Sequence, residues 1–134
     1  MVRFKRTMSK PSLRILIVDD SKFARDLIRG MLIEANFSNI WEAADEEEAI
    51  RMINDREPNL VLLDIDLGRA FDGVDLLQQI KTAQPEVKVI MVSALSQKIL
   101  EEDIISKSAD AFLIKPFKKE QLLFSIGLAM GYGV

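Results

Sequence analysis

The chain has 134 residues, of which 49% are hydrophobic and 29% charged, a balance that favours one globular domain over a disordered or fibrous protein. It contains no cysteine, so it has no disulfide framework. It contains no histidine either, which excludes a phosphohistidine, a Ser-His-Asp triad and a His-ligated zinc. A bound metal would have to use oxygen ligands, which favours Mg²⁺, Ca²⁺ or Mn²⁺.

The net charge of −3 is unevenly distributed along the chain. Residues 1–11 contain four of the 18 basic residues and no acidic one, so 14 basic and 21 acidic residues give the rest a charge of −7. We therefore expect a flexible basic tail over 1–11, or a true start at Met8, followed by one domain over 12–134. A domain this acidic is a poor partner for nucleic acid. Because the sequence shows no secretory signal and no apolar run of membrane length, we expect a cytoplasmic protein without membrane contact.

Two strand–helix units follow the tail. The apolar run Leu13–Val18 predicts a strand, and Ser21 is placed to cap the helix that follows. A second strand is expected around Asn39–Ala43, and Asp45 with Glu48 three residues later is typical of a helix N-terminus. The buried face of the first helix is expected to carry Ala24, Leu27, Ile28, Met31 and Ala35.

Three further units continue the alternation of short apolar strands with helical patterns. Prolines at 58 and 85 prevent the preceding helices from continuing. The strands are expected at Leu60–Leu63, Val87–Val92 and Ala111–Ile114, and the helices from Gly73, over 97–107 and over 118–130. Strands that are apolar throughout are buried on both faces and belong to a parallel sheet, so the predicted fold class is a doubly wound α/β domain.

Polar side chains stand at the carboxyl ends of the expected strands, where open α/β sheets bind their ligands. Asp19 and Asp20 follow the first strand, Asp64 the third, Ser93 the fourth and Lys115 the fifth. Three carboxylates would repel one another unless they shared a cation, and Mg²⁺ suits such oxygen ligands. A carboxylate such as Asp64 can attack phosphorus to give an acyl phosphate, while Mg²⁺ and Lys115 neutralise charge and Ser93 donates a hydrogen bond.

Four motifs, in order along the chain, resemble those of the receiver domains of two-component response regulators. They are Ile15–Ser21 with Arg25, Leu60–Asp64, Val92–Ala94 and Ala111–Phe117. The similarity extends over nearly all of residues 13–130. It implies a flavodoxin-like five-stranded parallel sheet in the order 2-1-3-4-5, with a stand-alone chain similar to the chemotaxis response regulator.

The resemblance also implies a role for each site residue. Asp64 would be the phosphoacceptor, and the bond between Lys115 and Pro116 would be cis. Mg²⁺ would be bound by Asp20, Asp64 and the backbone carbonyl of Asp66, with Asp19 holding a metal-bound water. Ser93 and Lys115 would contact the phosphoryl group, and Phe112 would be the aromatic switch residue.

The chain departs from the family pattern in the segment after Asp64. Receivers usually have a proline four residues after the phosphoacceptor and a glycine eight residues after it. Here Gly68 stands at the first position, and Gly73 lies nine residues on, so the loop over 67–72 is expected to hold one extra residue. Ser108 replaces a glycine that is usual before the fifth strand, which we interpret as a tolerated turn variation.

Other interpretations of these residues compete with this one. Asp19 and Asp20 are also suited to capping a helix, Ser93 to completing a turn and Phe112 to filling a core. The segment Asp64–Gly68 superficially resembles the nucleophile motif of haloacid-dehalogenase-type phosphatases, although those carry it on their first strand. A receiver fold that acts as a scaffold without phosphorylation is the other alternative.

We therefore expect a single-domain response regulator that is phosphorylated on Asp64 by a sensor histidine kinase or histidine phosphotransfer protein. It would be no enzyme beyond its own phosphorylation and dephosphorylation, and it would signal through protein contacts. On the last helix Leu122, Ile126 and Met130 form a stripe that should face the sheet, which leaves Phe124 and Leu128 on the opposite side. With Ile105 on the preceding helix, Phe124 and Leu128 are expected to form a patch for a downstream target or a homodimer.

Overall fold

The structure of the protein is a computed structural model, and it describes residues 12–66, 72–94 and 108–131. Five parallel strands form one sheet in the order β2-β1-β3-β4-β5. The strands are β1 (Arg14–Val18), β2 (Asn39–Ala43), β3 (Leu60–Asp64), β4 (Lys88–Ser93) and β5 (Ala111–Ile114). The predicted doubly wound fold and its strand order are therefore confirmed.

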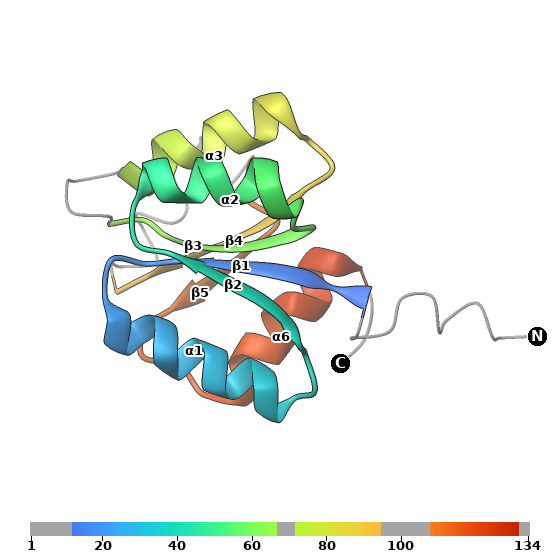
Figure 1. Cartoon of the computed structure of the whole chain (residues 1–134). Helices are drawn as coiled ribbons and strands as arrows, with labels where there is room; N and C mark the ends of the chain where they lie inside the picture. Colours follow the sequence, from blue (N-terminus) through green and yellow to red (C-terminus); the bar gives the residue numbers. More distant parts are fainter. Residues whose placement is uncertain (1–11, 67–71, 95–107, 132–134) are drawn as a thin grey trace, which may run out of the picture.

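The described helices cover both faces of the sheet. They are α1 (Lys22–Glu34), α2 (Glu46–Arg56), α3 (Asp72–Ala83) and α6 (Lys119–Met130). Helices α2 and α3 lie on one face and α1 and α6 on the other (Figure 1). The helix predicted over 97–107, including Ile105, the tail over 1–11 and most of the loop over 67–72 lie outside the described residues. Within the described ranges, no helix has the length and apolar character needed to cross a bilayer.

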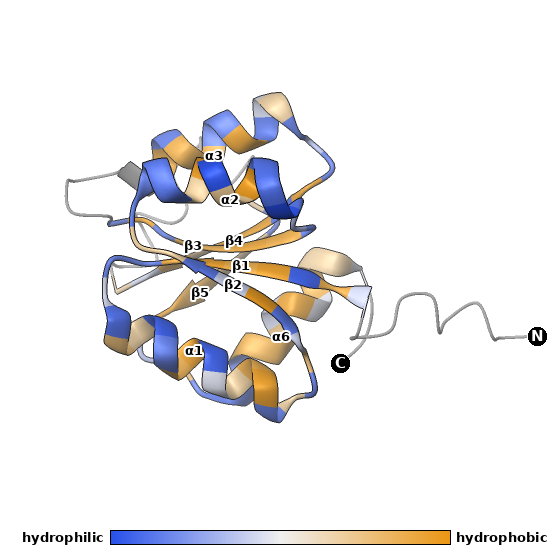
Figure 2. Ribbon diagram, in the orientation of Figure 1, coloured by the Kyte–Doolittle hydropathy of each residue, from blue (hydrophilic) through white to orange (hydrophobic). Residues whose placement is uncertain are grey.

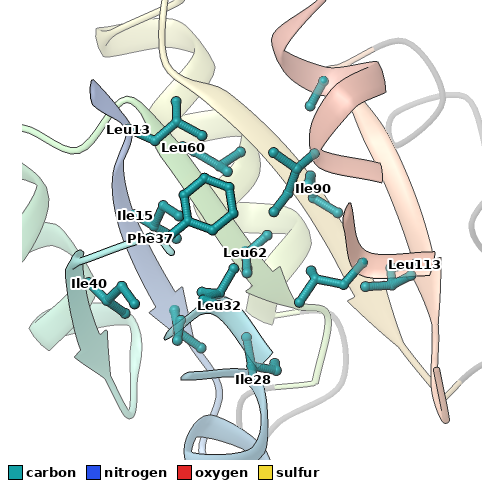
Figure 3. Packing of buried hydrophobic residues seen from close by; sticks show 14 of the residues in the cluster. Leu13, Ile15, Ile28, Leu32, Phe37, Ile40, Leu60, Leu62, Ile90 and Leu113 are labelled. Atoms are coloured by element: carbon teal, nitrogen blue, oxygen red, sulfur yellow. The ribbon is translucent and has the colours of Figure 1, made fainter. Parts of the chain in front are cut away.

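Side chains alternate along the strands between two separate hydrophobic clusters. Ile15 and Ile17 of β1 belong to the cluster under α1 and α6, whereas Leu16 and Val18 belong to the one under α2 and α3. In the first cluster the Phe37 ring lies among side chains of β1 and β3 (Figure 3). The central strands are accordingly hydrophobic between the two helical layers (Figure 2). Burial of this apolar surface on both sides of the sheet is what stabilises the fold.

The edge strand β5 departs from the prediction that the strands are buried on both faces. Ala111 and Leu113 are buried against α6, but Phe112 and Ile114 are 38% and 40% exposed. The reason is position: β5 is the outermost strand of the sheet, and α6 covers the face that carries Ala111 and Leu113. For β5 the prediction is therefore wrong.

The predicted helix starts are confirmed, and one predicted core residue is not. The Ser21 hydroxyl accepts a hydrogen bond from the backbone N–H of Ala24, and the Asp45 carboxylate accepts one from that of Glu48. On α1, however, Leu27 is 49% exposed, so its predicted place in the core is wrong. The buried stripe instead runs through Ile28, Leu32 and Ala35, and Leu27 lies about 100° round the helix from Ile28.

Candidate functional site

The carboxyl edge of the sheet brings the three predicted acids together. Asp19 and Asp20 follow β1, and Asp64 ends β3, the strand next to it. One carboxylate oxygen from each lies within 4.8 Å of the others. This proximity follows from the parallel pairing of β1 with β3, which places both strand ends at the same edge. The three side chains therefore form one acidic cluster, in which Asp19 and Asp20 lie beside Asp64.

Lys115 reaches this cluster from β5, two strands away from β3. Its Nζ lies 2.7 Å from Asp19 Oδ2 and 3.8 Å from Asp64 Oδ2. The backbone N–H of Lys115 donates to the carbonyl of Ser93, so the end of β5 is tied to the end of β4. The Lys115–Pro116 bond is cis, as predicted. Lys115 is thus an ion-pair partner of the acidic cluster.

The three carboxylates have different surroundings. Asp19 is buried, and its oxygens accept hydrogen bonds from the backbone N–H of Ser21 at 2.9 Å and from Lys115. Asp64 is also buried, at 7% exposed, and accepts a long hydrogen bond of 3.4 Å from the backbone N–H of Asp66. The Asp20 side chain is exposed and makes no hydrogen bond or ion pair within the described part of the chain.

Burial raises the pKa of Asp64 to about 6, and the negative charges of Asp19 and Asp20 act in the same direction. The positive charge of Lys115 and the hydrogen bond from Asp66 oppose this rise only in part. The cluster therefore carries more negative charge than its own lysine balances. A set of clustered carboxylate oxygens, one of them open to solvent, fits a hard divalent cation.

Gly73 shows why a glycine stands near the start of α3. Its backbone N–H donates to the carbonyl of Ile65 at 2.8 Å. A Cβ at this position would collide with the Asp64 carbonyl oxygen and would lie 2.7 Å from the Ile65 Cα, both of which are backbone atoms. Any side chain would push α3 away from the strand end that carries Asp64. The family pattern predicted a glycine near this position, and the close approach of the two backbones explains why it is needed.

The other predicted site residues in the described part of the chain lie on β4, β5 and α6. Ser93 is buried at the end of β4, next in sequence to Val92, the residue that pairs with Asp64 in the sheet. The Phe112 ring is partly exposed on β5, and its carbonyl accepts a hydrogen bond from the Ser125 hydroxyl of α6. Phe124 and Leu128 are 61% and 60% exposed on the outer side of α6, as the helical period predicted.

The contacts of Arg25 and Glu42 were not predicted from the sequence. Arg25 belongs to one of the four motifs, whereas Glu42 lies outside all of them. In the structure, the Arg25 guanidinium bonds both Glu42 of β2 and the carbonyl of Asp19. Seventeen residues separate the two side chains, and only the pairing of β2 with β1 brings them together, so no local pattern could have revealed the contact.

The fold and site define a doubly wound α/β protein with an acidic cluster, able to hold a metal ion, at the carboxyl edge of its sheet. The family model described as the response regulator receiver domain matches residues 15–126. The chain belongs to the family of response regulator receiver domains.

Relatives and solved structures agree with this assignment. The chain is 38% identical to protein CcdB of Bacillus subtilis over 119 residues, covering 89% of this chain and 98% of that protein. It is 37% identical to the chemotaxis protein CheY of Listeria monocytogenes over 111 residues, covering 83% and 92%. The crystal structure of the NtrX receiver domain from Brucella abortus superposes with a TM-score of 0.79 at 37% identity, covering 89% of this chain and 99% of that one. In a longer NtrX structure, with a TM-score of 0.80 at 37% identity, the match covers 89% of this chain and 27% of that chain.

Proposed function

We propose that this receiver domain accepts a phosphoryl group on Asp64, with Mg²⁺ bound by the acidic cluster. The observation that carries the proposal is the placement of Asp64. Its buried carboxylate lies beside two further acids and 3.8 Å from the Lys115 ammonium. A carboxylate in this setting lies close to a positive side chain and would lie close to a cation shared with the other two acids, and these are the groups that phosphoryl transfer needs.

Each residue of the site has a distinct part in this proposal. Asp20, Asp64 and the backbone carbonyl of Asp66 would hold Mg²⁺, and Asp19 would hold a water bound to it. The cation supplies neutralisation of charge on the phosphoryl oxygens. An Asp64 oxygen forms the new bond to phosphorus as the bond between phosphorus and the donor breaks, and the donor leaves with that electron pair.

Lys115 and Ser93 act on the phosphoryl group once it is transferred. Lys115 already lies between Asp19 and Asp64, so its ammonium can pair with a phosphoryl oxygen without a large movement. The Ser93 hydroxyl, at the end of the strand next to β3, would donate to another oxygen. Phe112, which pairs with Met91 of β4 and stands three residues before Lys115, would respond as the switch aromatic.

Family membership implies a histidine kinase or a histidine phosphotransfer protein as the donor. The chain has no histidine of its own. The downstream contact is proposed for the outer surface of β5 and α6, where Phe124 and Leu128 are exposed, together with Ile105. In this view residues 12–134 form a cytoplasmic receiver with a basic tail over 1–11. The chain is then no enzyme beyond its own phosphorylation and dephosphorylation.

The test is incubation of the full chain with acetyl phosphate and Mg²⁺, followed by mass spectrometry. A mass increase of about 80 Da is expected, and it should map to Asp64. The increase should disappear in Asp64→Asn and in the presence of excess EDTA. An unchanged mass in the wild-type protein would instead support a scaffold without phosphorylation. Turnover of a generic phosphatase substrate would support the phosphatase alternative.

A further inference from the structure

Arg25 of α1 connects the acidic loop to the neighbouring strand β2. Its NH1 group donates to the backbone carbonyl of Asp19 at 2.7 Å, and its Nε donates to Glu42 Oε1 at 3.0 Å. The side chain is 14% exposed, so this guanidinium is largely removed from water. A planar guanidinium can make two such bonds in fixed directions at once, which a lysine ammonium on a flexible stem cannot do.

Glu42 holds Arg25 in this orientation from the side of the sheet. Burial alone would raise the pKa of Glu42, but hydrogen bonds and charges from Arg29 and Arg25 outweigh it and lower that pKa. Glu42 therefore stays ionised at neutral pH. Its second oxygen accepts from Arg29 Nε at 2.6 Å, and Arg29 also donates to the carbonyl of Ile40. Arg29 shares Glu42 with Arg25, but its two bonds go to residues of β2 and not to the acidic loop.

The carbonyl of Asp19 is the backbone atom that matters for Asp20. It belongs to the peptide group between these two residues, so fixing it fixes the direction in which Asp20 leaves the end of β1. The Asp20 carboxylate has no hydrogen bond or ion pair of its own within the described ranges. Its place in the acidic cluster therefore depends on the backbone that carries it.

We propose that Arg25, oriented by Glu42, is a positioning residue that fixes the peptide between Asp19 and Asp20 and so places the Asp20 carboxylate for cation binding. This inference rests on the proposed function, because it concerns the same acidic cluster. It adds a requirement that the cluster alone does not contain: cation affinity depends on a guanidinium that touches neither the cation nor the phosphoryl group.

The test compares two changes that break the same kind of bond to Glu42. Arg25→Gln loses the bonds to Glu42 and to the Asp19 carbonyl, whereas Arg29→Gln loses only the bonds from α1 to Glu42 and Ile40 of β2. For each variant of the full chain, Mg²⁺ affinity is measured by titration calorimetry and stability by urea unfolding. Because loss of a residue that orients metal ligands commonly weakens binding 10–100-fold, we expect Arg25→Gln to weaken Mg²⁺ binding about tenfold. Arg29→Gln should stay within about twofold of the wild type at a similar loss of stability.

Arg25→Lys separates geometry from charge. It keeps the positive charge near the cluster but cannot bond Glu42 and Asp19 together, so Mg²⁺ affinity should fall nearly as far as in Arg25→Gln. This variant also decides the question if Arg25→Gln does not fold. Wild-type affinity in either Arg25 variant, or an equal loss in Arg29→Gln, would overturn the positioning role. A wild-type chain that binds no Mg²⁺ and takes no phosphoryl group would overturn the proposed function itself, and the positioning role with it.

Discussion

Asp64→Asn should make the metal-free protein more stable at neutral pH, even though it removes the proposed phosphoacceptor. The folded state raises the pKa of Asp64 from 3.8 to about 6, because burial and the neighbouring acids disfavour its charged form. Each pKa unit corresponds to about 1.4 kcal/mol, so ionised Asp64 costs the folded state about 3 kcal/mol. Asparagine has nearly the same shape and carries no charge, so it avoids this cost.

The pH dependence gives the sign of the effect. Below about pH 3 the Asp64 carboxyl is protonated in both the folded and the unfolded chain, so wild type and variant should have similar stability there and should differ only slightly at pH 4. As the pH rises towards 6 the unfolded chain releases this proton first, so the wild-type protein loses stability relative to the variant. Above pH 7 the difference should be constant at about 3 kcal/mol.

Urea unfolding in EDTA at pH 4, 5, 6 and 7.5 measures this difference. Asp55→Asn, at an exposed position on α2, is the matched control and should change stability by less than about 0.5 kcal/mol at every pH. Adding Mg²⁺ should stabilise the wild-type protein by about 1.4 kcal/mol for each tenfold excess over the dissociation constant, with little effect on Asp64→Asn. A variant that is less stable than wild type at pH 7.5, or a difference that does not vary with pH, would refute the reasoning.

Three further variants test other parts of the structure. Gly73→Ala should destabilise the protein by about 1–3 kcal/mol in urea unfolding and slow its phosphorylation, because the added Cβ collides with the Asp64 carbonyl; normal stability would contradict the close approach. Gly30→Ala, in the middle of α1 with open space around it, should instead stabilise by about 0.5–1 kcal/mol, and a loss would show that the site is not open. Replacing Phe124 with Ser and Leu128 with Gln should weaken phosphorylation-dependent association, measured by analytical ultracentrifugation, without lowering stability. Unchanged association would remove these side chains from the proposed patch.

The fold could be predicted from the sequence because its main signals are local. A strand buried on both faces is apolar at nearly every position, and the three central strands have this pattern, as β3 shows from Leu60 to Leu63. The positions of Asp19, Asp64 and Lys115 then follow from the rule that parallel strands end at one edge. The prediction for Leu27 failed because the helical period fixes which residues share a face, but not which edge of a broad apolar face meets the sheet.

The rest of the site depends on contacts between distant parts of the chain. The raised pKa of Asp64 arises from burial and from acids 44 and 45 residues away in sequence, and no motif measures burial. The contact of Arg25 with Glu42 needs β2 to lie beside β1, and the close approach of Gly73 needs the start of α3 to lie against the end of β3. Such features can be read only once the strand order and the packing are known.

The division of the hydrophobic core into two clusters has a consequence for how such a domain can diverge. Neighbouring residues of one strand, such as Leu16 and Ile17, pack into different helical layers, with the backbone of the sheet between them. A change of side-chain volume in one layer therefore has no direct route through side chains to the other, and substitutions in the two layers should combine additively. Each layer can be repacked separately over evolution while the strand ends keep the acids and the lysine in register. The acidic cluster and Lys115 at the carboxyl edge can thus keep their positions while many core residues are substituted.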